Sequence, residues 1–254
     1  MKKLLAITAL SAALFFGQTA VAEEKAAEEV KPSHVEMVLV LDESGSMSNL
    51  TNDTIGGFNS MIEKEKKLDV DAHVTTVLFN DQYKMLYNRR ELKDVSKMTD
   101  KDYTPGGMTA LLDAVGRTIH KMDMVAGIHR KDKGNKVLFV IITDGEENDS
   151  KEYTYADVKK LIKDRQENAG WEFIFLGANI DAAAAAENLG IDRDRAVKYK
   201  NTGSGVRANF KAVAELSDSL AKSGRVSDEW KETVEKDEDD AADKQSAAVT
   251  LHRR

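Results

Sequence analysis

The 254-residue chain contains no cysteine. No disulfide framework can therefore stabilise it, and no thiol is present to carry the acyl chains of a lipoprotein. The chain also lacks a cluster of basic residues, and its formal charge is −7, which together argue against nucleic acid as a partner. Stability must come from a hydrophobic core, and the chain is long enough for one sizeable domain.

Long apolar runs are scarce as well. The longest, at residues 4–16, is too short to span a bilayer comfortably. It follows a basic segment at residues 1–3 and precedes the small-residue motif Ala-Val-Ala at residues 20–22. This three-part pattern predicts a signal peptide at residues 1–22 and a periplasmic or secreted mature protein with no membrane span. A retained N-terminal anchor is the alternative. Cleavage of the signal peptide would remove Lys2 and Lys3 and so lower the formal charge of the protein from −7 to −9.

Apolar patterning then divides the rest of the chain. Residues 23–34 are charged and predict a linker, whereas residues 35–224 alternate between strand-like and helix-like segments. The patterns predict strands at residues 35–41, 70–79, 82–88, 136–142, 171–176 and 197–199. They predict helices at residues 53–67, 110–127, 154–168, 181–190 and 205–223. Residues 225–254 lose the apolar stripe and predict an acidic, largely solvated tail.

This alternation predicts one α/β domain. Strands separated by helices form βαβ units, which give a doubly wound, mainly parallel central sheet with helices on both faces. Ligands of such sheets bind at the carboxyl ends of the strands, near the point where the strand order reverses.

Oxygen-bearing side chains gather at three such positions. An Asp-x-Ser-x-Ser motif at residues 42–46 follows the first strand, a Thr-Asp-Gly motif at residues 143–145 follows the fourth, and a Thr-Pro-Gly-Gly-Met-Thr segment at residues 104–109 precedes a helix. Carboxylates and hydroxyls are the ligands that Mg²⁺ prefers. We therefore predict a metal site, whose ligands are Asp42, Ser44, Ser46, Thr109 and Asp144. Ligand type alone does not separate Mg²⁺ from Mn²⁺ or Ca²⁺.

With these motifs in this order, the chain resembles the von Willebrand factor type A (vWA) domain family over roughly residues 35–223. The resemblance implies the family's doubly wound fold with a metal-ion-dependent adhesion site on its top face. It also implies that Ser44, Ser46 and Thr109 ligate the metal directly and that Asp144 often acts through water. The implied activity is binding of a protein partner whose Asp or Glu carboxylate completes the coordination of the metal.

Two other functions are compatible with the sequence. A Mg²⁺-dependent phosphohydrolase could use Asp42 as a strand-end nucleophile, although Ser44 stands where that chemistry wants a second carboxylate. A periplasmic assembly or structural factor could instead hold its partner through the acidic tail. We expect a non-enzymatic, metal-dependent adhesion-type module.

Other polar residues are expected to have no chemical role. The five histidines show no ligand spacing, which favours structural or solvated side chains over a zinc site. Glu43, Glu146 and Glu147 crowd the metal loops, and we expect them to be solvated charges at the rim of the site rather than a collar that selects a partner.

Overall fold

The structure of the protein is a computed structural model, and it describes residues 34–125 and 135–236. The predicted signal peptide, residues 23–33 of the linker and residues 237–254 of the tail lie outside the described residues, as does the predicted end of the second helix beyond residue 125.

The described residues form a six-stranded sheet with the order β3-β2-β1-β4-β5-β6. Its strands are β1 (His34–Asp42), β2 (Ala72–Phe79), β3 (Tyr83–Glu91), β4 (Asn135–Thr143), β5 (Glu172–Gly177) and β6 (Ala196–Lys198). All neighbours pair in parallel except β2 and β3, which form an antiparallel pair at one edge. The predicted mainly parallel sheet is confirmed, and the strand order reverses between β1 and β4.

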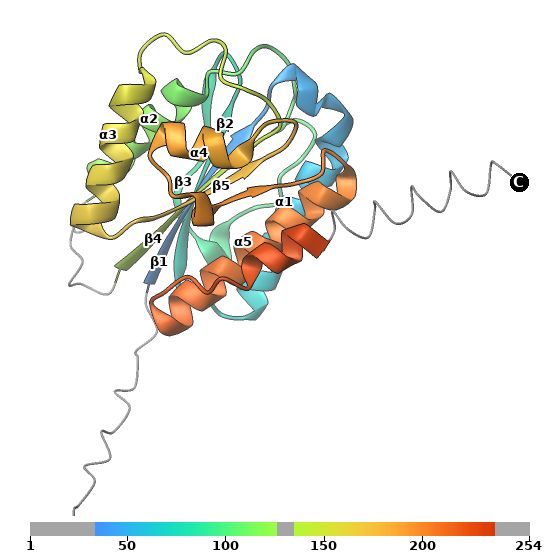
Figure 1. Cartoon of the computed structure of the whole chain (residues 1–254). Coiled ribbons are helices and arrows are strands. Elements are labelled where there is room, and N and C mark those ends of the chain that lie inside the picture. Colours follow the sequence, from blue (N-terminus) through green and yellow to red (C-terminus); the bar gives the residue numbers. More distant parts are fainter. Residues whose placement is uncertain (1–33, 126–134, 237–254) are drawn as a thin grey trace, which may run out of the picture.

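Helices cover both faces of this sheet (Figure 1). They are α1 (Thr51–Lys67), α2 (Leu111–Asp123), α3 (Tyr155–Asp164), α4 (Ala182–Leu189) and α5 (Gly203–Ser223). α4 is capped at both ends, because the Asp181 side chain accepts a hydrogen bond from the Ala184 amide and Gly190 ends the helix at a φ of 88°.

Side-chain alternation along the strands builds two separate cores. In β1, Met37 and Leu39 face α1 and α5, whereas Val38 and Val40 face α2, α3 and α4. Because successive residues of a strand point to opposite faces, a strand that is buried on both faces must be apolar almost throughout. This is why the sequence of β1 is a near-continuous apolar run.

The described domain extends beyond the boundary that the sequence predicts. Residues 225–236 include a helical segment, and its Trp230 and Val234 are each only 1% exposed and belong to the core beneath α1 and α5. The tail predicted to start at residue 225 therefore starts too early. Two isolated apolar residues among charges give too weak a stripe to predict this packing from sequence.

No helix of residues 34–125 and 135–236 combines the length and the apolar character that crossing a membrane requires.

The interface between α1 and α5 contains a buried acid. Glu65 is fully buried, and its carboxyl oxygens have no hydrogen-bond partner among the described side chains. Burial raises the pKa of Glu65 from its ordinary 4.5 to about 7, with the nearby Ser217 hydroxyl acting in the opposite direction. A group with a raised folded-state pKa contributes stability below its ordinary pKa, and this contribution is lost as the pH rises through about 7.

We therefore expect Glu65→Gln to stabilise the protein increasingly between about pH 4.5 and pH 7 relative to the wild type. The gain should reach about 3 kcal/mol above this window, because that is the free energy corresponding to the difference between the two pKa values. Urea unfolding of both proteins across this pH range measures it. Glu63→Gln, on the exposed side of the same helix, controls for the loss of one carboxylate. A pH-independent difference between wild type and Glu65→Gln would contradict the assignment.

Candidate functional site

The structure brings the five predicted ligand residues together at the carboxyl ends of β1 and β4. β1 ends at Asp42 and β4 ends at Thr143, and the two strands are neighbours in parallel register. Asp42 and Asp144 therefore lie beside each other at the point where the strand order reverses, which is where sheets of this kind bind ligands.

The loop after β1 folds back on the carboxylate that precedes it. Oδ1 of Asp42 accepts a hydrogen bond of 2.7 Å from the Ser44 amide, and Oδ2 accepts one of 2.5 Å from the Thr143 hydroxyl. A 3₁₀ turn, Gly45–Leu50, follows at once and carries Ser46. One oxygen of Asp42 is thus held by the loop that follows β1 and the other by the last residue of β4.

Hydroxyl groups then connect this loop to the loop after β4. The Ser44 and Ser46 hydroxyl oxygens are 3.0 Å apart, and the Ser46 hydroxyl donates a hydrogen bond of 2.5 Å to Oδ1 of Asp144. Oδ2 of Asp144 accepts from the side-chain amide of Asn201, at 3.3 Å. The Asp-x-Ser-x-Ser and Thr-Asp-Gly motifs therefore form one continuous polar cluster.

The third loop supplies Thr109 to the same cluster. The Thr109 amide donates to Oδ1 of Asn148 at 2.9 Å, and the Asn148 amide donates back to the Thr109 carbonyl at 3.0 Å. A Cβ added to Gly145 would lie 3.8 Å from Oγ1 of Thr109 and 4.0 Å from Oγ of Ser46. The two hydroxyls thus lie near the same glycine, which places Thr109 beside Ser46 in the cluster.

Backbone contacts fasten the first and third loops to each other. The Gly45 amide donates to the Gly107 carbonyl at 3.2 Å, and the Gly106 amide donates to the Glu43 carbonyl at 2.9 Å. Gly107 has a φ of 75°, and an added Cβ would lie only 1.9 Å from the Asp81 carboxylate, so only glycine fits there.

The electrostatic character of the cluster is unusual for a protein interior. Asp42 is 1% exposed and Asp144 is 2% exposed. Among the described residues, no lysine, arginine or histidine forms an ion pair with either carboxylate. Burial, together with the Asp144 charge, raises the pKa of Asp42 above its ordinary value, against the hydrogen bonds from Thr143 and Ser44. Buried charges normally have a charged partner or bind a metal.

The donor set is suited to a hard divalent cation. It consists of two carboxylates and three hydroxyls, and it contains neither imidazole nor sulfur. Mg²⁺, Mn²⁺ and Ca²⁺ prefer oxygen ligands, whereas softer transition metals favour nitrogen and sulfur. A cation placed here would also neutralise the two buried charges.

Two of the three acids expected at the rim have structural roles instead. Glu43 is 5% exposed, accepts from the Thr104 amide and lies 3.7 Å from the Lys84 ammonium. Glu147 accepts from the Leu112 amide at 2.9 Å, which ties the loop after β4 to the first turn of α2, and it also accepts from two amides of its own loop. Only Glu146 is an exposed rim charge.

Several residues that hold the site were not among the predicted ones. Thr143, Asn148 and Asn201 hydrogen-bond to the ligand residues, the Tyr103 hydroxyl donates to the Asp42 carbonyl at 2.6 Å, and Asn179 donates to the Asp144 carbonyl at 3.2 Å. Only Thr143 has a sequence signal, because it precedes Asp144 in a motif. Asn148 and Tyr103 lie close to the motifs but outside their patterns, and Asn179 and Asn201 come from distant loops that the sequence does not place.

Comparison with known proteins identifies the family. Residues 34–191 match the family described as vWA-TerF-like, a vWA domain found in the C terminus of TerF. The chain belongs to the vWA-TerF-like family. The predicted resemblance to vWA domains is thereby confirmed. None of the curated proteins compared with this vWA domain matches its sequence.

Solved structures with the same fold include proteins of bacterial pili. The PilB minor pilin from Streptococcus sanguinis is 12% identical, with a TM-score of 0.54, over 73% of this chain and 61% of that chain. The pilus adhesin SpaC from Lactobacillus rhamnosus GG in its open conformation is 14% identical, with a TM-score of 0.59, over 76% of this chain and 31% of that chain. The vWF domain of the type V pili tip protein Mfa5 from Porphyromonas gingivalis is 12% identical, with a TM-score of 0.53, over 78% and 99%.

These likenesses show the fold. This vWA domain spans less than two thirds of the pilin and about a third of the adhesin.

We expect Thr143→Val to destabilise the vWA domain in the absence of divalent cations. The substitution keeps the shape of the side chain but removes the hydrogen bond to Oδ2 of Asp42, leaving a buried carboxylate oxygen without that donor. The free energy of unfolding, measured with urea in EDTA, should fall by about 1–3 kcal/mol.

Thr118→Val is the matched control, because the equally buried Thr118 hydroxyl donates to the Ala114 carbonyl within α2 and not to a charge. Its cost should be smaller. Equal costs for the two variants would show that Thr143 does not specifically support the Asp42 carboxylate.

Proposed function

We propose that the chain is a metal-dependent protein-binding module of the adhesion type. One observation carries the proposal: Asp42 and Asp144 are buried side by side, and no described basic side chain pairs with either of them. Two uncompensated buried charges are costly. A divalent cation would offset that cost and would use the hydroxyls that already surround both carboxylates.

In this proposal Asp42, Ser44, Ser46, Thr109 and Asp144 hold Mg²⁺. Asp42 and Asp144 neutralise the ion, and the three hydroxyls bind it without adding charge. The ion therefore keeps an affinity for a further anionic ligand, which we assign to an Asp or Glu carboxylate of a protein partner. Mn²⁺ or Ca²⁺ would meet the same ligand types.

The surroundings of the site suit a partner surface. Met108, next to Thr109, is 50% exposed, and Tyr155 is 44% exposed. A cavity beside Asp144 is lined by the loop after β4 and by α4, including Gly145, Tyr155 and Ile180. A partner could therefore place apolar side chains next to its carboxylate, which would add hydrophobic contact area to the metal contact.

Binding is favoured over phosphoester hydrolysis for a structural reason. Hydrolysis with Asp42 as nucleophile wants a second carboxylate at position 44 and a lysine beside the phosphate. Lys84 does not fill this role, because its ammonium group pairs with Glu43 and donates a hydrogen bond to the Asp102 carbonyl. The occurrence of the fold in a pilus adhesin and a pilus tip protein supports adhesion for this chain also. We also propose a periplasmic or secreted location for this chain, with residues 1–22 as a signal peptide.

Asp144→Asn should weaken Mg²⁺ binding by about tenfold or more, because it removes one of the two charges that neutralise the ion. Isothermal titration calorimetry with MgCl₂ alone measures this and needs no knowledge of the partner. Asp149→Asn, in the same loop but outside the cluster, should bind Mg²⁺ as the wild type does. Equal affinity of the wild type and Asp144→Asn would refute the assignment of the metal.

Met108→Ser should lower partner capture about tenfold while leaving Mg²⁺ affinity unchanged, since it removes apolar contact area but no ligand. The immobilised protein is incubated with an envelope extract of its source cell in Mg²⁺ or in EDTA, and retained protein is quantified. Met124→Ser, whose side chain is 72% exposed at the end of α2, is the control and should capture normally. Capture that persists in EDTA would contradict a metal-dependent contact.

A further inference from the structure

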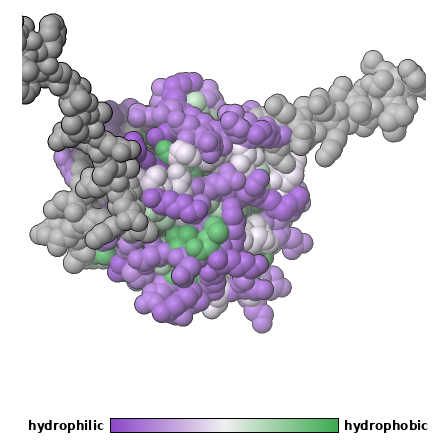
Figure 2. Space-filling view, turned by 90° about the horizontal axis from the view of Figure 1, so that it is seen from below, coloured by the Kyte–Doolittle hydropathy of each residue, from purple (hydrophilic) through white to green (hydrophobic). Residues whose placement is uncertain are grey.

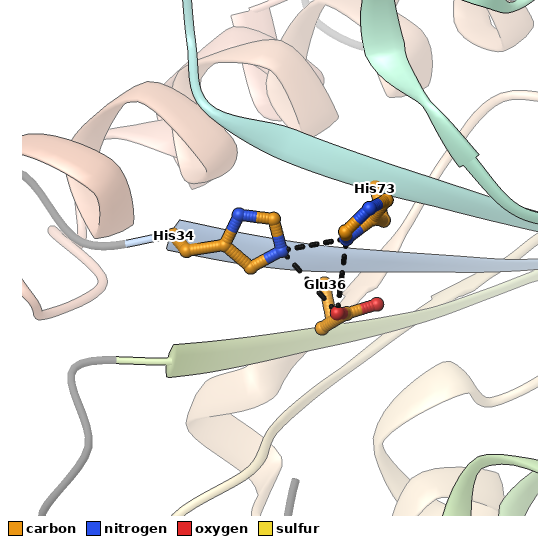
Figure 3. Close-up of side chains that lie close together, drawn as sticks. All are labelled: His34, Glu36 and His73. Atoms are coloured by element: carbon orange, nitrogen blue, oxygen red, sulfur yellow. Dashed lines mark hydrogen bonds and ion pairs between the residues drawn. The ribbon is translucent and has the colours of Figure 1, made fainter. Parts of the chain in front are cut away.

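A second polar cluster lies at the opposite end of β1 from Asp42. It consists of His34, Glu36 and His73, whose side chains point toward one another (Figure 3). Nε2 of His34 lies 2.8 Å from Nδ1 of His73, and each of these nitrogens lies 3.2 Å from Oε1 of Glu36. Glu36 is 2% exposed. Three atoms that can ligate a metal thus form a small triangle.

The register of two strands creates this cluster. His34 and Glu36 are two residues apart in β1 and share one face of the sheet, and His73 of β2 pairs directly with Glu36. His34 and His73 are 39 residues apart in sequence, so no ligand spacing among the histidines could reveal the site. The sequence therefore favours structural or solvated histidines, whereas the structure places this pair beside a buried carboxylate.

Neighbouring groups orient the donor atoms in the manner of a metal site. Nδ1 of His34 lies 2.9 Å from Oδ1 of Asp71, an acceptor, so in a neutral ring that donates to Asp71 the other nitrogen, Nε2, is the one that can bind a metal. Oε2 of Glu36 accepts from Nε of Arg89 at 3.0 Å, which leaves Oε1 toward the histidines. Metal-ligating histidines usually donate their other ring N–H to a carboxylate or carbonyl, and Asp71 is placed to accept from His34 in this way.

The size of the triangle matches a four-coordinate zinc ion. Zn–N and Zn–O bonds of about 2.0–2.2 Å in a tetrahedron place neighbouring ligand atoms about 3.3 Å apart. The observed separations are 2.8, 3.2 and 3.2 Å. We propose that His34 Nε2, His73 Nδ1 and Glu36 Oε1 bind one transition-metal ion of the Zn²⁺ class, with water in the fourth position.

Imidazole nitrogen sets this site apart from the cluster at Asp42. Two histidines and one carboxylate suit Zn²⁺ and neighbouring transition metals, whereas Mg²⁺ and Ca²⁺ prefer oxygen alone. The domain would then carry two cation sites of different chemistry, one at each end of β1.

Solvent reaches the cluster from one side. The His34 side chain is 19% exposed and that of His73 is 26% exposed, and both line a surface hollow together with Asp71, Glu91 and Lys93. Viewed from below, the described surface that is visible is mostly hydrophilic, with an apolar patch near its centre (Figure 2). An ion and its water ligand could therefore enter without opening the core.

Arg89 competes for the same atoms. Its Nη2 lies 2.5 Å from Oε1 of Glu36 and 3.3 Å from Nδ1 of His73, so this nitrogen must withdraw when a metal binds. A guanidinium beside the ion would also repel it. Removal of Arg89 should accordingly strengthen metal binding, an effect that a merely structural hydrogen-bond network would not produce.

The test uses the full chain without a histidine tag, freed of metal with EDTA and then titrated with ZnCl₂ in excess MgCl₂. His34→Gln and His73→Gln should each weaken zinc binding about tenfold or more, since loss of an outer-shell partner alone costs roughly 10–100-fold. Arg89→Met should strengthen zinc binding about tenfold. His120→Gln, which removes an exposed histidine of α2, is the control and should bind zinc as the wild type does.

Two further measurements separate binding from folding. Circular dichroism and thermal unfolding in EDTA verify that each variant is folded, and Co²⁺ in place of Zn²⁺ should give visible absorption bands in the wild type but not in His34→Gln or His73→Gln. The proposal is overturned if the wild type binds no zinc, if His34→Gln and His73→Gln bind it unchanged, or if Arg89→Met binds it more weakly than the wild type. None of these outcomes depends on whether Mg²⁺ binds at Asp42.

Discussion

Asp42 and Asp144 place two carboxylates side by side inside the protein. The loops at the carboxyl ends of β1 and β4 are arranged so that they hold these two side chains in place. The Ser44 amide and the Thr143 hydroxyl donate to Asp42, and the Ser46 hydroxyl donates to Asp144. These donors fix the carboxylates but carry no positive charge. An unpaired buried charge costs several kcal/mol, and we propose that a cation from outside the chain offsets this cost. The glycine-rich third loop hydrogen-bonds to the first loop, and Glu43 and Glu147 accept hydrogen bonds from backbone amides. These contacts fix the positions of the loops around the site.

The position of β1 in the parallel sheet gives this strand a different polar cluster at each of its two ends. β1 lies in the middle of the sheet, next to the reversal of strand order, and both of its faces are covered by helices. Its interior residues must therefore be apolar, and polar side chains are confined to its two ends. At the carboxyl end, Asp42 meets the loop after β4. At the amino end, His34 and Glu36 meet His73 of β2, and a separate polar cluster that contains two imidazole rings results.

The parts of the structure that depend on local sequence are predictable. The apolar run of β1 predicts a central strand, and the Asp-x-Ser-x-Ser and Thr-Asp-Gly motifs place their side chains at strand ends, where parallel pairing brings them together. The missed features depend on contacts between distant segments. The pairing of Glu36 with His73 requires the β1–β2 register, and the burial of Trp230 depends on its packing into a core that also contains residues of α1 and α5. Glu147 looks solvated in sequence because nothing local shows that the Leu112 amide will reach it.

We propose that a divalent cation compensates the buried charges of Asp42 and Asp144. Anomalous diffraction from crystals of the full chain grown in saturating MnCl₂ tests it most directly, because Mn²⁺ replaces Mg²⁺ at oxygen sites and its position can be located independently of the protein atoms. We expect an anomalous peak between the hydroxyl oxygens of Ser44, Ser46 and Thr109. This peak should lie close enough to both carboxylates for direct or water-bridged coordination. Well-ordered crystals with no Mn²⁺ peak in this cluster would contradict it.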